Sequence, residues 1–164
     1  CDWSSDVCSS DLYHWRTSRP HEYTHSQLNS LGDDNALFKT GPAHGAPPQN
    51  VRLGANDFLL DHLGGGFDLL YFTDESTIPE TLQHTLTAVR AKGVPVKVIA
   101  VGSPQAVTGA DITLADANGH LRERYGVPAN GGAYLLRPDQ HICARWLTLD
   151  ATRLQAAFHT ALPQ

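Results

Sequence analysis

The chain has 164 residues, with 17 acidic and 12 basic side chains and a formal net charge of −5. This acidic balance argues against nucleic acid or an anionic membrane as a partner, and no apolar run approaches the roughly 20 residues that a membrane span needs. The length suits one domain of about 100 residues preceded by a less ordered lead.

Residues 1–12 do not resemble the rest of the chain. They lack the basic and apolar regions of a signal peptide, and they match one translated frame of a common short-read sequencing adapter. We interpret them as a sequencing-adapter artefact; a real disordered tail is the alternative. Because the sequence has no Met, we interpret the remainder as a fragment. Without residues 1–12 the net charge becomes −2 and Cys143 alone remains, which favours a reducing cytoplasm.

The first part of the remainder has weak structural signals. Residues 13–38 are polar and have no sustained periodicity, so we expect them to be poorly ordered. Residues 39–50 contain three prolines and two glycines, which is typical of a linker. An ordered domain is predicted over residues 51–164, beginning with a short helix capped by Asp57 and ended by the glycines at 64–66.

A strand, a helix and a second strand follow. Residues 67–72 are almost continuously apolar, as in a strand buried on both faces. Thr77 and Glu80 have the spacing of a capping box, and Gly93 gives the helix a C-terminal stop. Residues 94–101 are again rich in β-formers. This order predicts a βαβ unit with parallel strands.

Residues 116–164 predict a hairpin between two helices. A short helix should end at Gly126, and strands over 133–137 and 141–146 should be joined by a turn at Pro138 and Asp139. Asp150 should cap a terminal helix, with Leu149 packing against Leu154 as a hydrophobic staple. The order βαβ and then ββα predicts an α/β, thioredoxin-like fold.

The thiol chemistry of that fold is not supported by the residues. Redox members place a reactive cysteine after the first core strand, at a helix N-terminus that lowers its pKa. Residues 73–77 contain no cysteine, and Gly131 and Gly132 stand where redox members carry a cis-proline. Cys143 falls in a predicted strand, where a small buried residue is the simplest interpretation. We therefore expect a redox-inactive domain with no catalytic, cofactor-binding or metal-binding residue.

From about Gly45 onward the chain resembles the C-terminal thioredoxin-like domain of FAD-dependent aromatic-ring hydroxylases, the flavoprotein monooxygenase class that includes phenol hydroxylase and hydroxyphenylpropionate hydroxylase. The resemblance covers roughly two thirds of the chain in the family's order. The stretches that carry it are GAPPQNVRL (45–53), FLLDHLGGGFDLLYF (58–72), RERYGV (122–127) and AYLLRPDQHICARW (133–146).

The resemblance implies that residues 13–38 are the tail of a missing catalytic region. Complete members use FAD, NAD(P)H and O2 to hydroxylate a phenolic or polyketide-like ring. Their GxGxxG turn, whose backbone N–H groups hold the flavin pyrophosphate, is absent here. The resemblance therefore implies a non-catalytic domain that binds no cofactor itself, contacts its own FAD-binding and substrate region, and has a role in subunit stability or in assembly as a homo-oligomer.

Two alternatives remain open. One is a free-standing, redox-inactive thioredoxin-like interaction module. The other is a zinc metallohydrolase, because His21-Glu22-x-x-His25 matches the HExxH pattern that puts two ligands on one helix face. The flanking residues are polar and Pro20 directly precedes the motif, so a chance match is the favoured interpretation.

Overall fold

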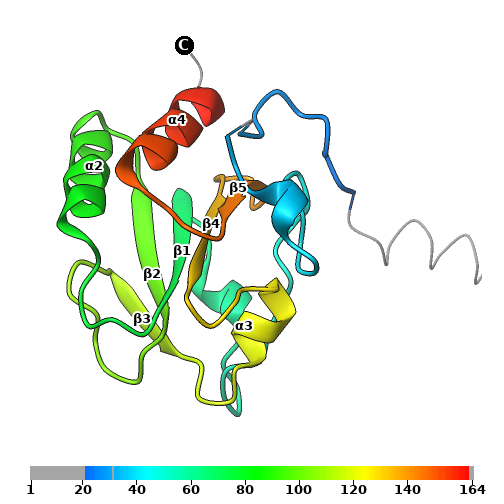
Figure 1. The fold of residues 1–164 in the computed structure, drawn as a ribbon, viewed down its shortest axis with the longest axis vertical. Coiled ribbons are helices and arrows are strands. Elements are labelled where there is room, and N and C mark those ends of the chain that lie inside the picture. The colour runs from blue at the N-terminus through cyan, green and yellow to red at the C-terminus, as the bar shows by residue number, and fades with distance from the viewer. Residues whose placement is uncertain (1–20, 31, 163–164) are drawn as a thin grey trace, which may run out of the picture.

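The computed structural model describes residues 21–30 and 32–162, and it has a mixed α/β fold around one five-stranded sheet (Figure 1). The interpretation of residues 1–12 lies outside this described part. The elements, in chain order, are η1 (Asn35–Leu37), η2 (Leu59–His62), β1 (Phe67–Thr73), α2 (Glu80–Ala91), β2 (Val96–Gly102), β3 (Ile112–Ala115), α3 (His120–Tyr125), β4 (Gly132–Leu136), β5 (Ile142–Trp146) and α4 (Ala151–Ala161).

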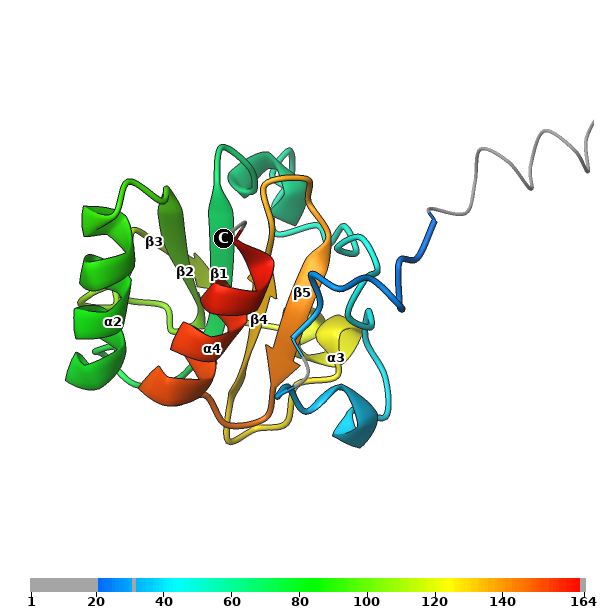
Figure 2. The same cartoon turned by 90° about the horizontal axis from the view of Figure 1, so that it is seen from above.

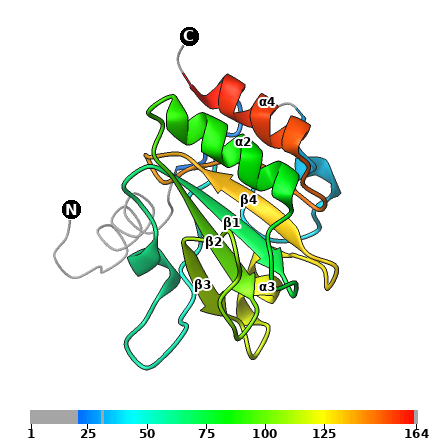
Figure 3. The same ribbon diagram turned by 90° about the vertical axis from the view of Figure 1, so that its left-hand side faces the viewer.

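The strands lie in the order β3-β2-β1-β4-β5. The first three are parallel, and β4 and β5 form an antiparallel hairpin whose first strand pairs with β1. Helices α2 and α4 lie side by side on one face (Figure 3), and α3 and the residues before β1 cover the other (Figure 2). Each face buries its own apolar cluster. This is a mixed α/β sheet compatible with the predicted thioredoxin-like class.

Strand β1 is the central strand of the sheet, and nearly all of its side chains are buried. Leu69 packs among residues beneath α2 and α4, whereas Leu70 and Phe72 pack toward α3. A strand that buries apolar side chains on both faces reads as a continuous apolar run, which explains why the sequence predicts it well.

The start of α2 differs from the prediction. The helix begins at Glu80 with Pro79 as its N-cap, and no side chain caps it, so the expected capping box of Thr77 and Glu80 is wrong. Thr77 instead forms a parallel bridge with Thr108. The end of the helix agrees with the prediction: Gly93 has a φ of +82° and its N–H donates to Arg90 O.

Strand β3 is not predicted by the sequence. It continues the parallel part of the sheet beyond β2, with Ile112 opposite Ile99 and Leu114 opposite Val101. Only Leu114 is buried. A four-residue edge strand with one buried side chain has too short an apolar pattern to be recognised locally.

The short helix before β1 also begins differently from the prediction. The residues form the 3-10 helix η2, with Phe58 rather than Asp57 at its N-cap position. Asp61 accepts a hydrogen bond from the Phe58 N–H, and Asp57 contacts His62 at 2.7 Å.

The C-terminal hairpin and helix form as predicted. Gly126 ends α3 with a φ of +64°, and Gln140 N–H donates to Arg137 O across the turn at Pro138 and Asp139. Asp150 caps α4 by accepting a hydrogen bond of 2.8 Å from Arg153 N–H. Within residues 21–30 and 32–162, none of the helices is long and apolar enough to cross a membrane.

Candidate functional site

The carboxyl end of β1 is where the redox chemistry of thioredoxin-like domains takes place, and here an ion pair occupies it. Asp74 Oδ1 lies 2.7 Å from Arg122 Nη2. Thr73 Oγ1 accepts a hydrogen bond from Glu75 N–H at 3.0 Å and shapes the turn that follows. No thiol is present in residues 73–77. The residues at this position are therefore a carboxylate and a guanidinium rather than a thiol.

Arg122 connects this position to the rest of the fold. Its Nη1 also donates to the carbonyls of Pro128 and Ala129, at 3.3 and 3.2 Å. Asp116 holds the start of α3 in place by accepting the Leu121 and Arg122 N–H groups. In open α/β sheets, ligands bind outside the carboxyl ends of the strands. That location is spanned here by the Arg122 side chain.

The segment before α2 is covered by the loop after β2. Thr108 N–H donates to Ser76 O at 2.8 Å, and Ile78 N–H donates to Thr108 O at 2.9 Å. The backbone groups of residues 76 and 78 are therefore already paired within the chain, which leaves them unavailable for pairing with a substrate peptide.

A glycine replaces the cis-proline of redox members. Gly131 has a φ of +101°, and a Cβ there would lie 2.7 Å from Phe72 O. No cis peptide bond occurs in the described residues. The backbone conformation and the close approach to β1 both require glycine at this position.

Cys143 lies in β5, beneath α2 and α4, with no exposed surface. Its thiol donates to Leu135 O at 3.4 Å, and burial raises its pKa to about 12. A thiol with this pKa carries very little thiolate near neutral pH, so its environment is that of a core residue rather than a nucleophile.

The HExxH residues do not form the helix that the motif needs. Residues 21–23 have no regular secondary structure and residues 24 and 25 form a turn, with Ser26 N–H donating to Tyr23 O and Tyr23 N–H donating to Gly45 O. Two histidines four apart share one face only on a helix. In the described part of the chain, no group of three or more His, Cys, Asp or Glu side chains could hold a metal ion.

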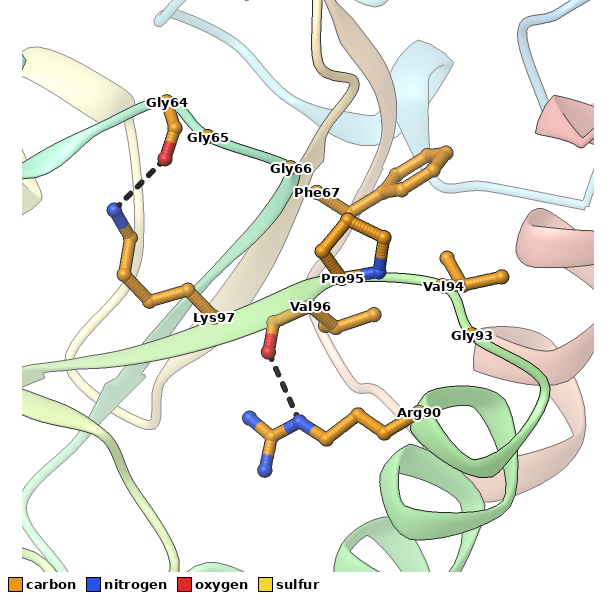
Figure 4. A pocket seen from close by; sticks show the side chains of 10 residues that line it. All are labelled: Gly64, Gly65, Gly66, Phe67, Arg90, Gly93, Val94, Pro95, Val96 and Lys97. Carbon is orange, nitrogen blue, oxygen red and sulfur yellow. Dashed lines mark hydrogen bonds between the residues drawn. The ribbon is translucent and has the colours of Figure 1, made fainter.

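A shallow pocket of about 470 Å³ lies at the opposite end of β1 and β2, between the glycines at 64–66 and the turn after α2 (Figure 4). Its described lining has two ionisable side chains, and both are engaged with backbone carbonyls. Arg90 Nε donates to Val96 O at 2.9 Å, and Lys97 Nζ donates to Gly64 O at 3.1 Å. This lining does not contain an acid–base pair for catalysis.

The outer edge of β5 is the most extensively built polar site in the described structure. Residues that precede Val51 in the sequence satisfy its backbone groups: Ser30 N–H donates to Cys143 O at 2.7 Å, and Asp34 N–H donates to Arg145 O at 2.8 Å. Further along, Ile142 exchanges hydrogen bonds with residues 45 and 46. A strand edge left open invites pairing with other chains, and this edge is closed by the chain's own N-terminal segment.

Arg145 binds the N-terminal segment that pairs with β5, and its own side chain is almost fully buried. Its guanidinium donates to the Asn35 side chain at 2.6 Å and to the carbonyls of Asn35, Thr40 and Gly41. It also lies 4.6 Å from the centre of the Phe38 ring. A buried cation therefore depends on neutral acceptors that come from residues 35–41.

An ion pair between Arg153 and Asp34 is the second contact that holds this N-terminal segment. Arg153 Nη2 lies 2.6 Å from Asp34 Oδ1, and Leu147 N–H donates to Asp34 Oδ2 at 2.9 Å. Burial alone would raise the pKa of Asp34. The hydrogen bonds from Arg153 and Leu147, with the charge of Arg153, outweigh it and lower this pKa below its ordinary value. We call residues 29–46, with these two arginine contacts, the clasp.

The two arginines of the hairpin, Arg137 and Arg145, do not face each other. The register places Tyr134 opposite Arg145. Arg137 pairs with Asp139 in its own turn, at 2.7 Å. Tyr134 and Trp146 are both buried without exposed surface, so both are core residues.

The fold and this site define a mixed α/β, thioredoxin-like class of domain whose thiol position holds an ion pair. Comparison with protein-family models gives no match, and comparison with curated proteins gives none. Solved structures do share the fold.

Three of these similar structures contain or use flavin. The flavin-dependent monooxygenase PieE, solved with FAD and substrate, is 23% identical with a TM-score of 0.59 over 88% of this chain. Aklavinone-11 hydroxylase, solved with FAD and aklavinone, is 26% identical with a TM-score of 0.57 over 88% of this chain. The rebeccamycin biosynthetic enzyme RebC, solved substrate-free and with reduced flavin, is 19% identical with a TM-score of 0.57 over 86% of this chain.

These similarities confirm the resemblance to FAD-dependent hydroxylases. The present chain spans about a quarter of the length of these proteins: 25% of PieE, 26% of aklavinone-11 hydroxylase and 22% of RebC.

Proposed function

We propose that this chain is a C-terminal fragment of an FAD-dependent aromatic-ring monooxygenase, and that the part present is a non-catalytic domain for subunit stability or assembly. The observation that carries this proposal is the shared fold over 86–88% of the chain with three flavin enzymes. FAD and NAD(P)H belong to the proposed full-length protein and not to this fragment.

The residues at the thiol position support the non-catalytic role. The Asp74–Arg122 pair and the buried Cys143 leave this end of the sheet without an accessible thiol among the described residues. The clasp supports a structural role, because it joins the domain to the chain that precedes it through two arginines. The proposed partners are the protein's own FAD-binding and substrate region and further copies of itself.

The substrate class and compartment are part of the same proposal. Aklavinone-11 hydroxylase was solved with aklavinone, and on that similarity we assign the full-length protein a phenolic or polyketide-like aromatic ring. Hydroxylation would place one oxygen atom of O2 on the ring and release the other as water, with NAD(P)H supplying two electrons. The proposed compartment is the cytoplasm.

Long-read sequencing of the source locus across the codon for Tyr13 tests this function. An upstream reading frame that carries GxGxxG after its first strand, and whose purified product contains FAD, is the expected result. A start codon just upstream of Tyr13, with no flavin-binding frame, would leave a free-standing binding module. Zinc in the purified product at one equivalent per chain would favour the metallohydrolase.

A further inference from the structure

The tripeptide Ala-Asn-Gly occurs twice in the chain, at 117–119 and at 129–131. An Asn that is followed by Gly is chemically labile, because glycine has no side chain to hinder its backbone nitrogen from attacking the Asn side-chain carbonyl carbon. The attack forms a C–N bond and closes a succinimide ring, and the side-chain nitrogen leaves as ammonia. Water then opens the ring at either carbonyl and gives aspartate or isoaspartate, with no oxidation or reduction.

The two tripeptides adopt the same local turn. Gly119 N–H donates to Asp116 O at 3.0 Å, and Gly131 N–H donates to Pro128 O at 3.0 Å. Both glycines have a positive φ, of +68° and +101°, and both asparagines are exposed. Sequence and turn geometry therefore do not separate the two sites, so a difference in their reactivity has to come from tertiary contacts.

The second turn is held from outside by Arg122. Its Nη1 donates to the carbonyls of Pro128 and Ala129, at 3.3 and 3.2 Å. Its Nη2 lies 2.7 Å from Asp74 Oδ1, so the guanidinium is itself held in place. These contacts fix the two peptide groups that directly precede Asn130.

The glycine of the second turn is fixed on its other side by the sheet. A Cβ at Gly131 would lie 2.7 Å from Phe72 O, which shows how closely the backbone approaches β1 there. The next residue, Gly132, begins β4 and lies opposite Phe72 in the ladder. Cyclisation requires the Gly131 nitrogen to leave its hydrogen bond and turn toward the Asn130 side chain. That movement would disturb both the Arg122 contacts and the start of β4.

The first turn has no comparable contacts. Among the described residues, no atom lies within 4 Å of a Cβ built at Gly119. Gly119 O accepts a hydrogen bond from Glu123 N–H at 2.9 Å, within the six-residue helix α3. Movement of the peptide group between Asn118 and Gly119 therefore disturbs only the first turn of a short helix, and helix ends open readily.

We propose that Asn118 deamidates spontaneously in the folded protein, whereas the Arg122 contacts protect Asn130 from the same reaction. Protection at Asn130 is important for the fold, because isoaspartate would insert a methylene group into the main chain just before β4. This inference assigns the Asp74–Arg122 pair a protective role at the position where redox members carry their thiol. It does not depend on the proposed function.

Peptide mapping by mass spectrometry tests the proposal on the present chain, incubated folded in mildly alkaline buffer. Deamidation adds about 1 Da and one negative charge, and tryptic cleavage after Arg122 and Arg124 places the two asparagines in separate peptides. Asn118 should react at least about tenfold faster than Asn130, because a reaction that needs local opening is slowed by the small open population. In denaturant the two rates should become similar, because the tertiary contacts are lost.

Three variants identify the source of the protection. Arg122→Ala should raise the rate at Asn130 by about tenfold, because it removes charge-assisted hydrogen bonds to the turn, and should leave the rate at Asn118 unchanged. Arg124→Ala, at an exposed position of the same helix, is the matched control and should change neither rate. Asp74→Ala removes only the ion pair and should give a smaller rise at Asn130. Because the Asp74 side chain is 73% exposed, this variant should fold even if Arg122→Ala does not.

The outcomes are distinct. Equal rates at the two asparagines of the folded chain, or a faster reaction at Asn130, overturn the proposal. An unreactive Asn118 in the folded chain, under conditions in which the denatured chain reacts, overturns the modification site. A folded Arg122→Ala chain that still protects Asn130 overturns the role of Arg122. If Arg122→Ala is unfolded by circular dichroism, an Asp74→Ala chain with an unchanged rate at Asn130 overturns that role instead.

Discussion

At the scale of single residues, Cys143 shows how burial decides chemistry. With a pKa raised to about 12 by burial, its thiolate fraction at pH 8 is roughly one in ten thousand. In a chain carrying Cys1→Ser and Cys8→Ser, we expect no reaction with a disulfide reagent under native conditions and one thiol titrated in denaturant. Rapid native labelling of Cys143 would contradict the buried environment described here.

Gly131 is the second residue whose role can be tested alone. Gly131→Ala combines a φ of +101° with a Cβ placed 2.7 Å from Phe72 O, and should lower the unfolding free energy by about 2 to 4 kcal/mol. Gly119→Ala is the matched control, because its φ is +68° but nothing lies within 4 Å of its Cβ; about 1 kcal/mol is expected. Chemical denaturation measures both, and equal losses would show that the contact with β1 is unimportant.

At the scale of elements, the clasp should make stability depend on pH. The pKa of Asp34 is lowered in the folded protein, so its ion pair with Arg153 stabilises the fold above the unfolded-state pKa, ordinarily near 3.8, and this contribution is lost as pH falls through the folded-state pKa. Asp34→Asn should cost about 1 kcal/mol at pH 7 and have little effect at about pH 2. Chemical denaturation across this pH range measures the unfolding free energy of both proteins. A difference between them that stays constant with pH would contradict the prediction.

Asp68 should contribute a pH dependence of stability with the opposite sign, which makes it a useful comparison. Burial raises its pKa despite its hydrogen bonds with Gly64 and Lys97. A carboxyl whose folded-state pKa is raised disfavours folding when ionised, so its contribution improves as pH falls. The acid dependence that disappears in Asp34→Asn should therefore remain in Asp68→Asn.

The clasp also bears on where the folding unit begins. A domain boundary at residue 51 stays a prediction from composition, yet residues 29–46 supply hydrogen bonds to the β5 edge. We expect a chain beginning at Val51 to lose cooperative unfolding and to aggregate, because β5 would be open and Arg145 would lose its acceptors. A chain beginning at Tyr13 is the control. Size-exclusion chromatography and thermal unfolding compare the two.

At the scale of the whole molecule, the proposed function separates flavin chemistry from this domain. In the full-length protein, a stop codon in place of the codon for Lys39 of the present chain should leave the FAD-binding residues intact while lowering the apparent melting temperature or changing the assembly size. Replacing only Asp74 and Arg122 by alanine should leave NAD(P)H consumption unchanged, because neither belongs to the proposed flavin site. Loss of catalysis in that double variant, with flavin and stability retained, would show a direct role for the domain.

The sequence by itself determined the elements whose signals are local. The apolar run of β1, the turn at Pro138, the Asp150 cap and the glycine stops each depend on a few neighbouring residues, so they were predicted correctly. The absence of a cysteine after β1 also required no structure.

Only the tertiary structure decided which distant residues meet. Asp74 pairs with Arg122 across 48 positions, and Asn35 binds Arg145 across 110. The Thr77 capping box failed because Thr77 pairs with Thr108 in a loop that no local pattern places there. The β5 edge, like every strand edge, needs partners for its backbone groups, but only the folded chain shows that residues 29–46 provide them.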